Sequence, residues 1–121
     1  MAGRRKRSRR SIVCLIGSGR HDEGYRRAYL EETIAGKIVL SMAFGMDGKR
    51  YEVAAEKAEQ LEALHREKIT LADEVLVINT GGYIGASTSA EIMYAIALGK
   101  RLRWTECPPL NFFVEQGLLP E

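Results

Sequence analysis

Short runs of aliphatic residues alternate with longer helical patterns along most of this chain, and that alternation limits the fold more than any other feature. Residues 12–16 form a continuous apolar run, which is typical of a strand covered on both faces. The pattern predicts further strands at residues 37–41, 74–78 and 101–104, with helices at residues 22–35, 50–71 and 89–98. Strands joined through helices by short glycine-containing loops form a parallel sheet with helices on both faces. We therefore predict a Rossmann-like three-layer α/β sandwich with a four- or five-stranded parallel sheet.

The 121 residues are enough for one domain with its own core and too few for two. A last short helix is expected around residues 112–116, after Pro108 and Pro109. No stretch approaches the roughly 18 apolar residues of a transmembrane helix, and no apolar segment of secretory length follows the N-terminus, so we expect no membrane association. Cys14 lies in the first strand and Cys107 beside a proline, a pattern typical of reduced thiols in the cytoplasm and not of zinc ligands.

Positive charge is concentrated at the N-terminus. Residues 1–10 hold six of the 18 Lys and Arg residues, so the remainder carries 12 basic against 16 acidic residues. We interpret residues 1–10 as a disordered basic tail and residues 11–121 as the folded domain. Such a tail can bind nucleic acid by counterion release. Elsewhere, no basic helix face and no aromatic residues interleaved with basic ones support nucleic-acid recognition.

In parallel α/β sheets, ligands bind beyond the carboxyl ends of the strands. The first loop at that edge, Gly17-Ser-Gly-Arg20, lacks the third glycine of the dinucleotide fingerprint, because Asp22 stands in its place. The lysine of a Walker loop is also absent, so neither motif predicts NAD or ATP binding. The backbone N–H groups of the loop, with Ser18 and Arg20, suit a phosphate or a sugar hydroxyl. A plain tight turn with an exposed Arg20 is the alternative.

Residues 79–91 read Asn-Thr-Gly-Gly-Tyr-Ile-Gly-Ala-Ser-Thr-Ser-Ala-Glu, and two interpretations of this stretch stay open. Thr88-x-x-Glu91 fits a capping box, in which the glutamate bonds back to the backbone of the cap residue. However, the loop is longer than a cap requires and rich in hydroxyl groups. Glu91 also shares a helix face with Tyr94 and Ala95, which turns it toward the sheet. A half-buried carboxylate at this edge is a candidate nucleophile.

His65 is the only polar member of the apolar face of the long helix, which otherwise consists of Ala54, Ala58, Leu61, Ile69 and Ala72. A histidine on such a face is either a satisfied core residue or a functional group. If His65 faces the same edge as Glu91, it can orient the nucleophile or donate a proton.

The stretch Leu64-His-x-x-Lys-Ile-x-x-Ala-Asp-Glu-Val-x-Val-Ile-Asn79, followed by Gly-Tyr-Ile-Gly-x-Ser-Thr-x-x-Glu-Ile, resembles the nucleoside 2-deoxyribosyltransferase-like superfamily. The similarity extends over about residues 11–104. Members of this superfamily include nucleoside deoxyribosyltransferases and nucleoside 5′-monophosphate N-glycosidases. The resemblance implies a Rossmann-like fold, a dimer or larger homo-oligomer, and a glutamate nucleophile at the position of Glu91. It also implies cleavage of, or transfer at, the N-glycosidic bond of a nucleoside or nucleoside 5′-monophosphate, with no metal or redox cofactor.

Smaller motifs extend the resemblance and also limit it. Gly17-Ser-x-Arg20 matches the first loop of the nucleotide N-glycosidases, and Tyr29 matches a tyrosine that follows this loop. The aspartate in their long helix falls near His65, so the second acidic group is missing or replaced here. The loop before Glu91 partly resembles that of the lonely-guy phosphoribohydrolases, in which a threonine at the spacing of Thr88 holds a 5′-phosphate.

These comparisons lead to a defined set of expected site residues. We expect Glu91 as the nucleophile and His65 as a catalytic partner, with His65 or Asp22 protonating the leaving base. The residues expected to bind substrate are Gly17, Ser18, Arg20, Asp22, Asn79, Tyr83, Gly85, Ser87 and Thr88. A non-catalytic nucleotide-binding module on the same fold is the alternative. The apolar residues of segments 42–49 and 112–113 predict a homodimer or larger assembly, because a monomer would expose them.

Overall fold

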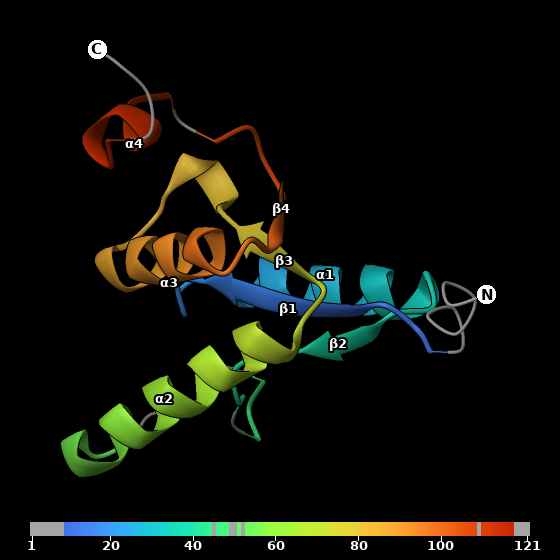
Figure 1. Ribbon diagram of the computed structural model, residues 1–121. Coiled ribbons are helices and arrows are strands. Elements are labelled where there is room, and N and C mark those ends of the chain that lie inside the picture. Colours follow the sequence, from blue (N-terminus) through green and yellow to red (C-terminus); the bar gives the residue numbers. More distant parts are fainter. Residues whose placement is uncertain (1–8, 45, 49–50, 52, 109, 118–121) are drawn as a thin grey trace.

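Four parallel strands form a single sheet in the order β2-β1-β3-β4 (Figure 1). The computed structural model describes residues 9–44, 46–48, 51, 53–108 and 110–117. The strands are β1 (Ile12–Gly17), β2 (Ile38–Leu40), β3 (Glu74–Ile78) and β4 (Arg101–Trp104). Val13 pairs with Glu74 across the central pair β1 and β3, while Ile12 pairs with Ile38 on the other side of β1. The predicted all-parallel sheet is confirmed, with four strands in the described part of the chain.

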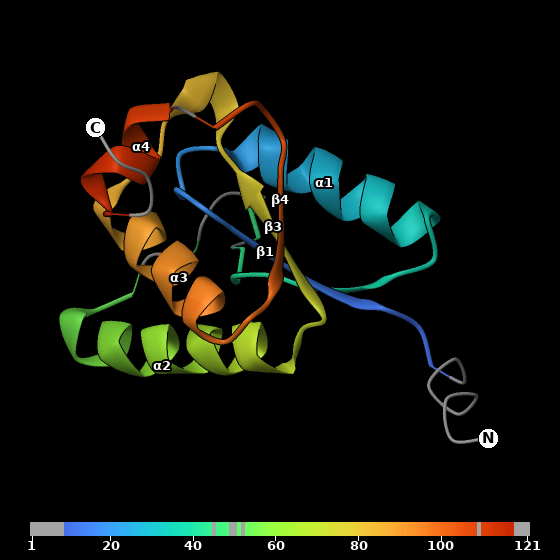
Figure 2. The same cartoon turned by 45° about the horizontal axis from the view of Figure 1, so that its top comes forward.

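Helices cover both faces of this sheet. They are α1 (Asp22–Ile34), α2 (Ala55–Leu71), α3 (Ala86–Ala97) and the short α4 (Leu110–Glu115), with a 3₁₀ turn η2 (Thr80–Gly82) between β3 and α3. Helix α1 lies on one face, and α2 and α3 lie on the other (Figure 2). The predicted three-layer Rossmann-like sandwich is therefore confirmed. None of the helices in the described part of the chain is long and apolar enough to cross a membrane.

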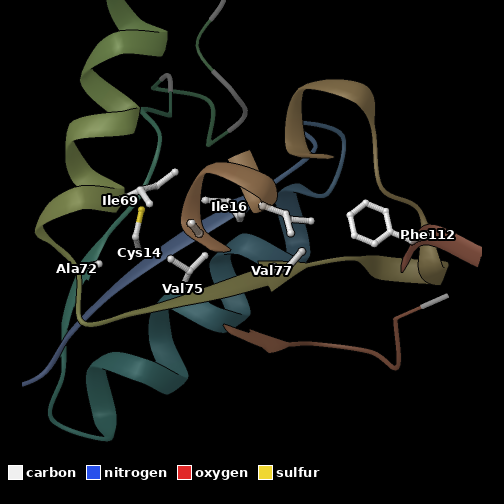
Figure 3. Close-up of a cluster of buried hydrophobic side chains, with 9 residues drawn as sticks. Cys14, Ile16, Ile69, Ala72, Val75, Val77 and Phe112 are labelled. Carbon is white, nitrogen blue, oxygen red and sulfur yellow. The ribbon is translucent and has the colours of Figure 1, made fainter. Parts of the chain in front are cut away.

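The core divides into two clusters because successive side chains of β1 and β3 point to opposite faces. On the side of α2 and α3, Cys14 and Ile16 pack with Val75, Val77 and Ile69 (Figure 3). On the side of α1, the alternate residues of the same strands pack with that helix: Val13, Leu15, Leu76 and Ile78 with Tyr25 and Ala28. Each large apolar side chain buried in this way contributes about 1.5–3 kcal/mol. Burial on both faces explains why β1 has a continuous apolar sequence.

Helices α2 and α3 begin at residues other than those predicted. Helix α2 begins at Ala55 and not at residue 50, although residues 49, 50 and 52 lie outside the described part. The Tyr51 N–H donates to the Ala43 carbonyl oxygen, which draws this segment toward the end of β2 and away from the helix. Helix α3 begins at Ala86 and not at Ser89, because Gly85 is already its N-cap.

A ring of four charges ties α1 to the two strands β3 and β4. Arg103 Nε donates to Glu74 Oε1 over 2.7 Å, and the Arg103 guanidinium also bonds the carboxylate of Glu32. Lys37 Nζ lies 2.9 Å from Glu74 Oε2 and 3.3 Å from Glu32 Oε1. Burial alone would raise the pKa of Glu32 and Glu74, but the hydrogen bonds to Arg103 and Lys37 outweigh it and lower both pKa values. Both carboxylates are therefore ionised and stabilising at neutral pH.

The N-terminal segment is held to the body from Arg9 onward. The Arg9 guanidinium donates to both carboxylate oxygens of Asp73, over 2.9 and 3.0 Å, and Asp73 also accepts the Ile12 N–H. Two residues of the predicted tail, Arg9 and Arg10, therefore belong to the described part of the chain, and Arg9 is bonded to the domain. Residues 1–8 of the predicted tail lie outside the described residues.

Candidate active site

A pocket of about 380 Å³ lies at the carboxyl ends of β1 and β2, between α2 and α3. Its lining comes from five parts of the chain: residues 17–19 after β1, Tyr25 of α1, Met42, Ala43, Tyr51 and Val53 after β2, one side of α2 from Ala58 to Lys68, and the start of α3 from Tyr83 to Glu91. The size is within the usual range for small-molecule sites. This is the sheet edge at which the sequence predicts ligand binding.

Glu91 lines this pocket from the second turn of α3 and is only 6% exposed. Gly85, in an extended conformation, is the N-cap, so Thr88 is the third residue of the helix and Glu91 the sixth. The first helical hydrogen bond runs from the Ser89 N–H to the Gly85 carbonyl oxygen. The capping-box interpretation is therefore wrong: a residue this far inside the helix cannot bond the cap backbone. Glu91 is turned instead toward the sheet and the pocket, as the second interpretation predicted.

His65 of α2 lies opposite Glu91, with its Nε2 atom 3.7 Å from Glu91 Oε1. Burial lowers the pKa of His65; the charge of Glu62 raises it by less than burial lowers it, and the charge of Lys68 adds a still smaller lowering effect. The imidazole is therefore neutral at neutral pH and forms no ion pair with the carboxylate. Its Nδ1 atom is buried without a hydrogen-bond partner in the described part of the chain. His65 therefore lines the pocket beside Glu91, with one ring nitrogen left without a hydrogen bond in the described residues.

The loop after β1 forms one polar wall of the pocket, through Gly17, Ser18 and Gly19. A Cβ atom at Gly17 would come within 2.6 Å of the Ile78 carbonyl oxygen, so only glycine allows β1 to end this close to β3. Tyr25 of α1 holds this loop in place, because its hydroxyl donates to the Gly17 carbonyl oxygen over 2.8 Å. Ser18 Oγ accepts the Arg20 N–H over 3.3 Å.

The N-terminus of α3 forms the opposite polar wall. Gly85, Ser87, Thr88 and Tyr83 all line the pocket, as expected from the sequence. Among the residues that the structure describes, no side chain caps this helix. Its first N–H groups have no partner within the helix and favour an anion through the helix dipole.

Three of the expected substrate-binding residues do not line the pocket. Asn79 is fully buried, and its amide donates to the Glu106 carbonyl oxygen and accepts the Glu106 N–H, so it fastens the end of β3 to the segment after β4. Arg20 lies over the ring of Tyr83, 4.2 Å from the ring centre. Asp22 is the first residue of α1 and provides no side-chain cap. Tyr29, which carried part of the resemblance, is 54% exposed on α1.

The structure adds pocket residues that the sequence analysis did not select. Glu62 and Lys68 line the pocket from the same side of α2 as His65, three residues before and after it. Lys68 Nζ donates to the Ser41 carbonyl oxygen over 2.7 Å. The helical spacing to His65 was the signal that could have identified both residues. Beneath the site, burial and the charge of Glu91 raise the pKa of Cys14 to about 12, so its thiol is unreactive.

No family model matches the chain, and no curated protein is significantly similar to it. The family resemblance therefore rests on the quoted motifs alone. Within the described ranges, no three His, Cys, Asp or Glu side chains gather in a way that could hold a metal ion.

Proposed function

We propose that this protein cleaves, or transfers at, the N-glycosidic bond of a nucleoside or nucleoside 5′-monophosphate, with Glu91 as the nucleophile. The observation that carries the proposal is the burial of the Glu91 carboxylate in the pocket wall beside a neutral His65. Such an arrangement is typical of a reactive group and unusual for a structural one.

The reaction that suits this site has two halves. Glu91 attacks the anomeric carbon through an oxocarbenium-like transition state and forms a glycosyl-enzyme, which water or a second base then resolves. His65 orients the Glu91 carboxylate from the facing helix. The loop at Gly17 and Ser18 and the N-terminus of α3 at Ser87 and Thr88 hold the sugar and its phosphate.

We further propose a homo-oligomer, a dimer or larger, in the cytoplasm. Residues 55–61 of α2 are all exposed, and this end of the helix projects from the body of the molecule (Figure 1). Large apolar side chains beside the pocket are also exposed: Tyr51, Leu61 and Leu64. Of the apolar residues in segments 42–49 and 112–113, Met46 is exposed as expected, whereas Met42, Phe44, Phe112 and Phe113 pack within the chain. Light scattering at micromolar concentration is expected to show at least a dimer, and a monomer mass would refute this proposal.

A non-catalytic nucleotide-binding module is the second candidate. One observation favours it: the position at which related enzymes carry an acidic residue in the long helix is occupied by a neutral histidine.

A panel of nucleosides and 5′-monophosphates separates the two candidates. Free base is followed by chromatography, and binding is measured by calorimetry on the same samples. We expect release of free base from at least one member of the panel. Measurable binding with no release from any member would refute the enzyme and favour the module.

A further inference from the structure

The end of the molecule opposite the pocket is formed by four segments, which we call the amino face: residues 9–12, 33–38, 70–74 and 97–102. All four strands begin here, and α1, α2 and α3 end here. The end of α1 and the start of β1 lie far from α4 (Figure 2). Hydrogen bonds join each segment to the next: Ile38 to Ser11, Asp73 to Ile12 and Lys100 to Ala72. The amino face is therefore one continuous surface.

Positive charge is concentrated on the amino face. Its segments carry five of the 18 Lys and Arg residues but only two of the 16 Asp and Glu residues. Residues 1–8, which precede it in the sequence, hold four more basic residues and no acidic one. That leaves nine basic against 14 acidic residues in the rest of the chain, so the amino face and the remainder carry charge of opposite sign.

Two of the five basic residues on the amino face have a guanidinium group available to an external anion. The other three have partners within the fold: Arg9, Lys37 and Lys100. Arg10 and Arg101 are exposed, and neither forms an ion pair with a residue that the structure describes. Internal salt bridges therefore do not account for these two cations.

Exposed aliphatic side chains lie among these charges. Each of the helices that end at the amino face places one there: Ile34 of α1, Leu71 of α2 and Leu98 at the C-cap of α3. Ile34 is 75% exposed and Leu71 is 65% exposed, and β2 begins with the half-exposed Ile38. Several large apolar groups on one surface indicate a binding site, because their removal from water is favourable.

Cations and aliphatic groups on one surface fit the boundary of an anionic membrane. The cations are attracted to acidic headgroups, and the aliphatic side chains enter the region between headgroups and acyl chains. A nucleic acid would also attract the cations, but it is bound through aromatic and polar side chains, whereas the four exposed apolar residues here are aliphatic. A second copy of the chain that docked through the same face would bring like charges together.

We propose that the amino face binds the surface of a membrane that contains anionic lipids, with Arg10 and Arg101 at the headgroups and Ile34 and Leu71 beneath them. The pocket lies at the opposite edge of the sheet and stays open to solvent in this orientation. A surface contact needs neither a spanning helix nor a leader segment, the two features on which the expectation from the sequence was based. The proposal does not depend on the reaction proposed for Glu91.

The first test is co-sedimentation of the full chain with two kinds of vesicle, phosphatidylcholine alone and phosphatidylcholine with about 30% phosphatidylglycerol. We expect binding to the anionic vesicles only, and weaker binding as NaCl is raised from about 0.1 M to about 0.5 M. Arg10→Gln combined with Arg101→Gln should weaken binding by about 10-fold or more. Arg27→Gln combined with Lys57→Gln removes two charges from exposed positions outside the amino face and should weaken it less than about 3-fold.

The second test separates the aliphatic contact from charge. Ile34→Ser combined with Leu71→Ser keeps every charge and should also weaken binding to the anionic vesicles by about 10-fold or more. Leu30→Ser combined with Leu110→Ser, at exposed positions outside the amino face, is the matched control and should bind as the wild type does. Thermal unfolding is measured for each variant, and Leu71→Ser alone replaces the pair if the pair does not fold.

Four results would overturn the proposal. The first is binding to neither kind of vesicle, or to both equally. The second is full binding by a folded variant that lacks the aliphatic side chains, which would assign the binding to charge alone. The third is tighter binding to a single-stranded RNA oligonucleotide than to anionic vesicles at the same salt concentration, which would indicate a nucleic-acid surface. The fourth is a lower mass of the aliphatic variant in light scattering with unchanged vesicle binding, which would indicate an interface between copies of the chain.

Discussion

Glu91→Gln changes the charge of the proposed nucleophile while keeping its size and the hydrogen-bonding reach of its side chain. A glutamine amide cannot form the glycosyl-enzyme, so we expect turnover to fall by about 1,000-fold or more, a loss of about 4 kcal/mol in transition-state stabilisation. Binding of nucleotide should persist, because the loop at Gly17 and the start of α3 are unchanged. Release of free base by chromatography and binding by calorimetry give the two quantities separately.

The same substitution has a second expected effect, on stability. His65 is neutral and 3.7 Å from Glu91, so removing the carboxylate charge leaves no cationic imidazole without its partner. Glutamine keeps the size of the side chain, so the free energy of unfolding should change by no more than about 1 kcal/mol, which is a Tm shift of roughly 3–6 °C for a domain of this size. Glu67→Gln, at an exposed position of α2, is the matched control. Retention of more than about a tenth of wild-type turnover, a loss under ~1.4 kcal/mol, would refute the nucleophile assignment. Destabilisation by more than about 2 kcal/mol would show that the carboxylate is structural.

Two further predictions concern charge and pH. Arg103→Met leaves Glu32 and Glu74 with one cation between them, so urea unfolding at pH 7 should show a loss of about 3 kcal/mol, against little change for the exposed Arg101→Met. Both carboxylates have lowered pKa values in the folded protein, so their contribution to stability is present above the unfolded pKa of about 4.3 and is lost as the pH falls below it. The difference in unfolding free energy between wild type and Arg103→Met should therefore shrink in acid. A difference that does not change with pH would contradict this. The lowered pKa of His65 means that the wild type loses stability as pH falls below the unfolded value of about 6.5, and His65→Gln should lose less between pH 7 and pH 5. Parallel stability curves for the two proteins would show that His65 is not buried in its neutral form.

Local patterns in the sequence were sufficient for the architecture. The apolar run at residues 12–16 can be satisfied only by a strand covered on both faces, and the structure buries Val13 to Ile16 completely. Gly17 and Gly85 mark the ends at which the chain turns toward the pocket, because these positions need close approach or an extended cap. Element type and order follow from periodicity and turn chemistry, which act over a few neighbouring residues.

The role of Glu91 depended on tertiary structure. Thr88-x-x-Glu91 fits a cap and a buried pocket residue equally well, and the choice was made by where α3 starts, which Gly85 determines. His65 lies beside Glu91 because α2 packs beside α3, a contact between segments far apart in the chain. Asn79 does not line the pocket, because its side-chain amide is hydrogen-bonded to the backbone of Glu106 in the segment after β4. Sequence spacing predicts which face of an element a residue occupies, whereas only packing between distant segments decides what that face meets.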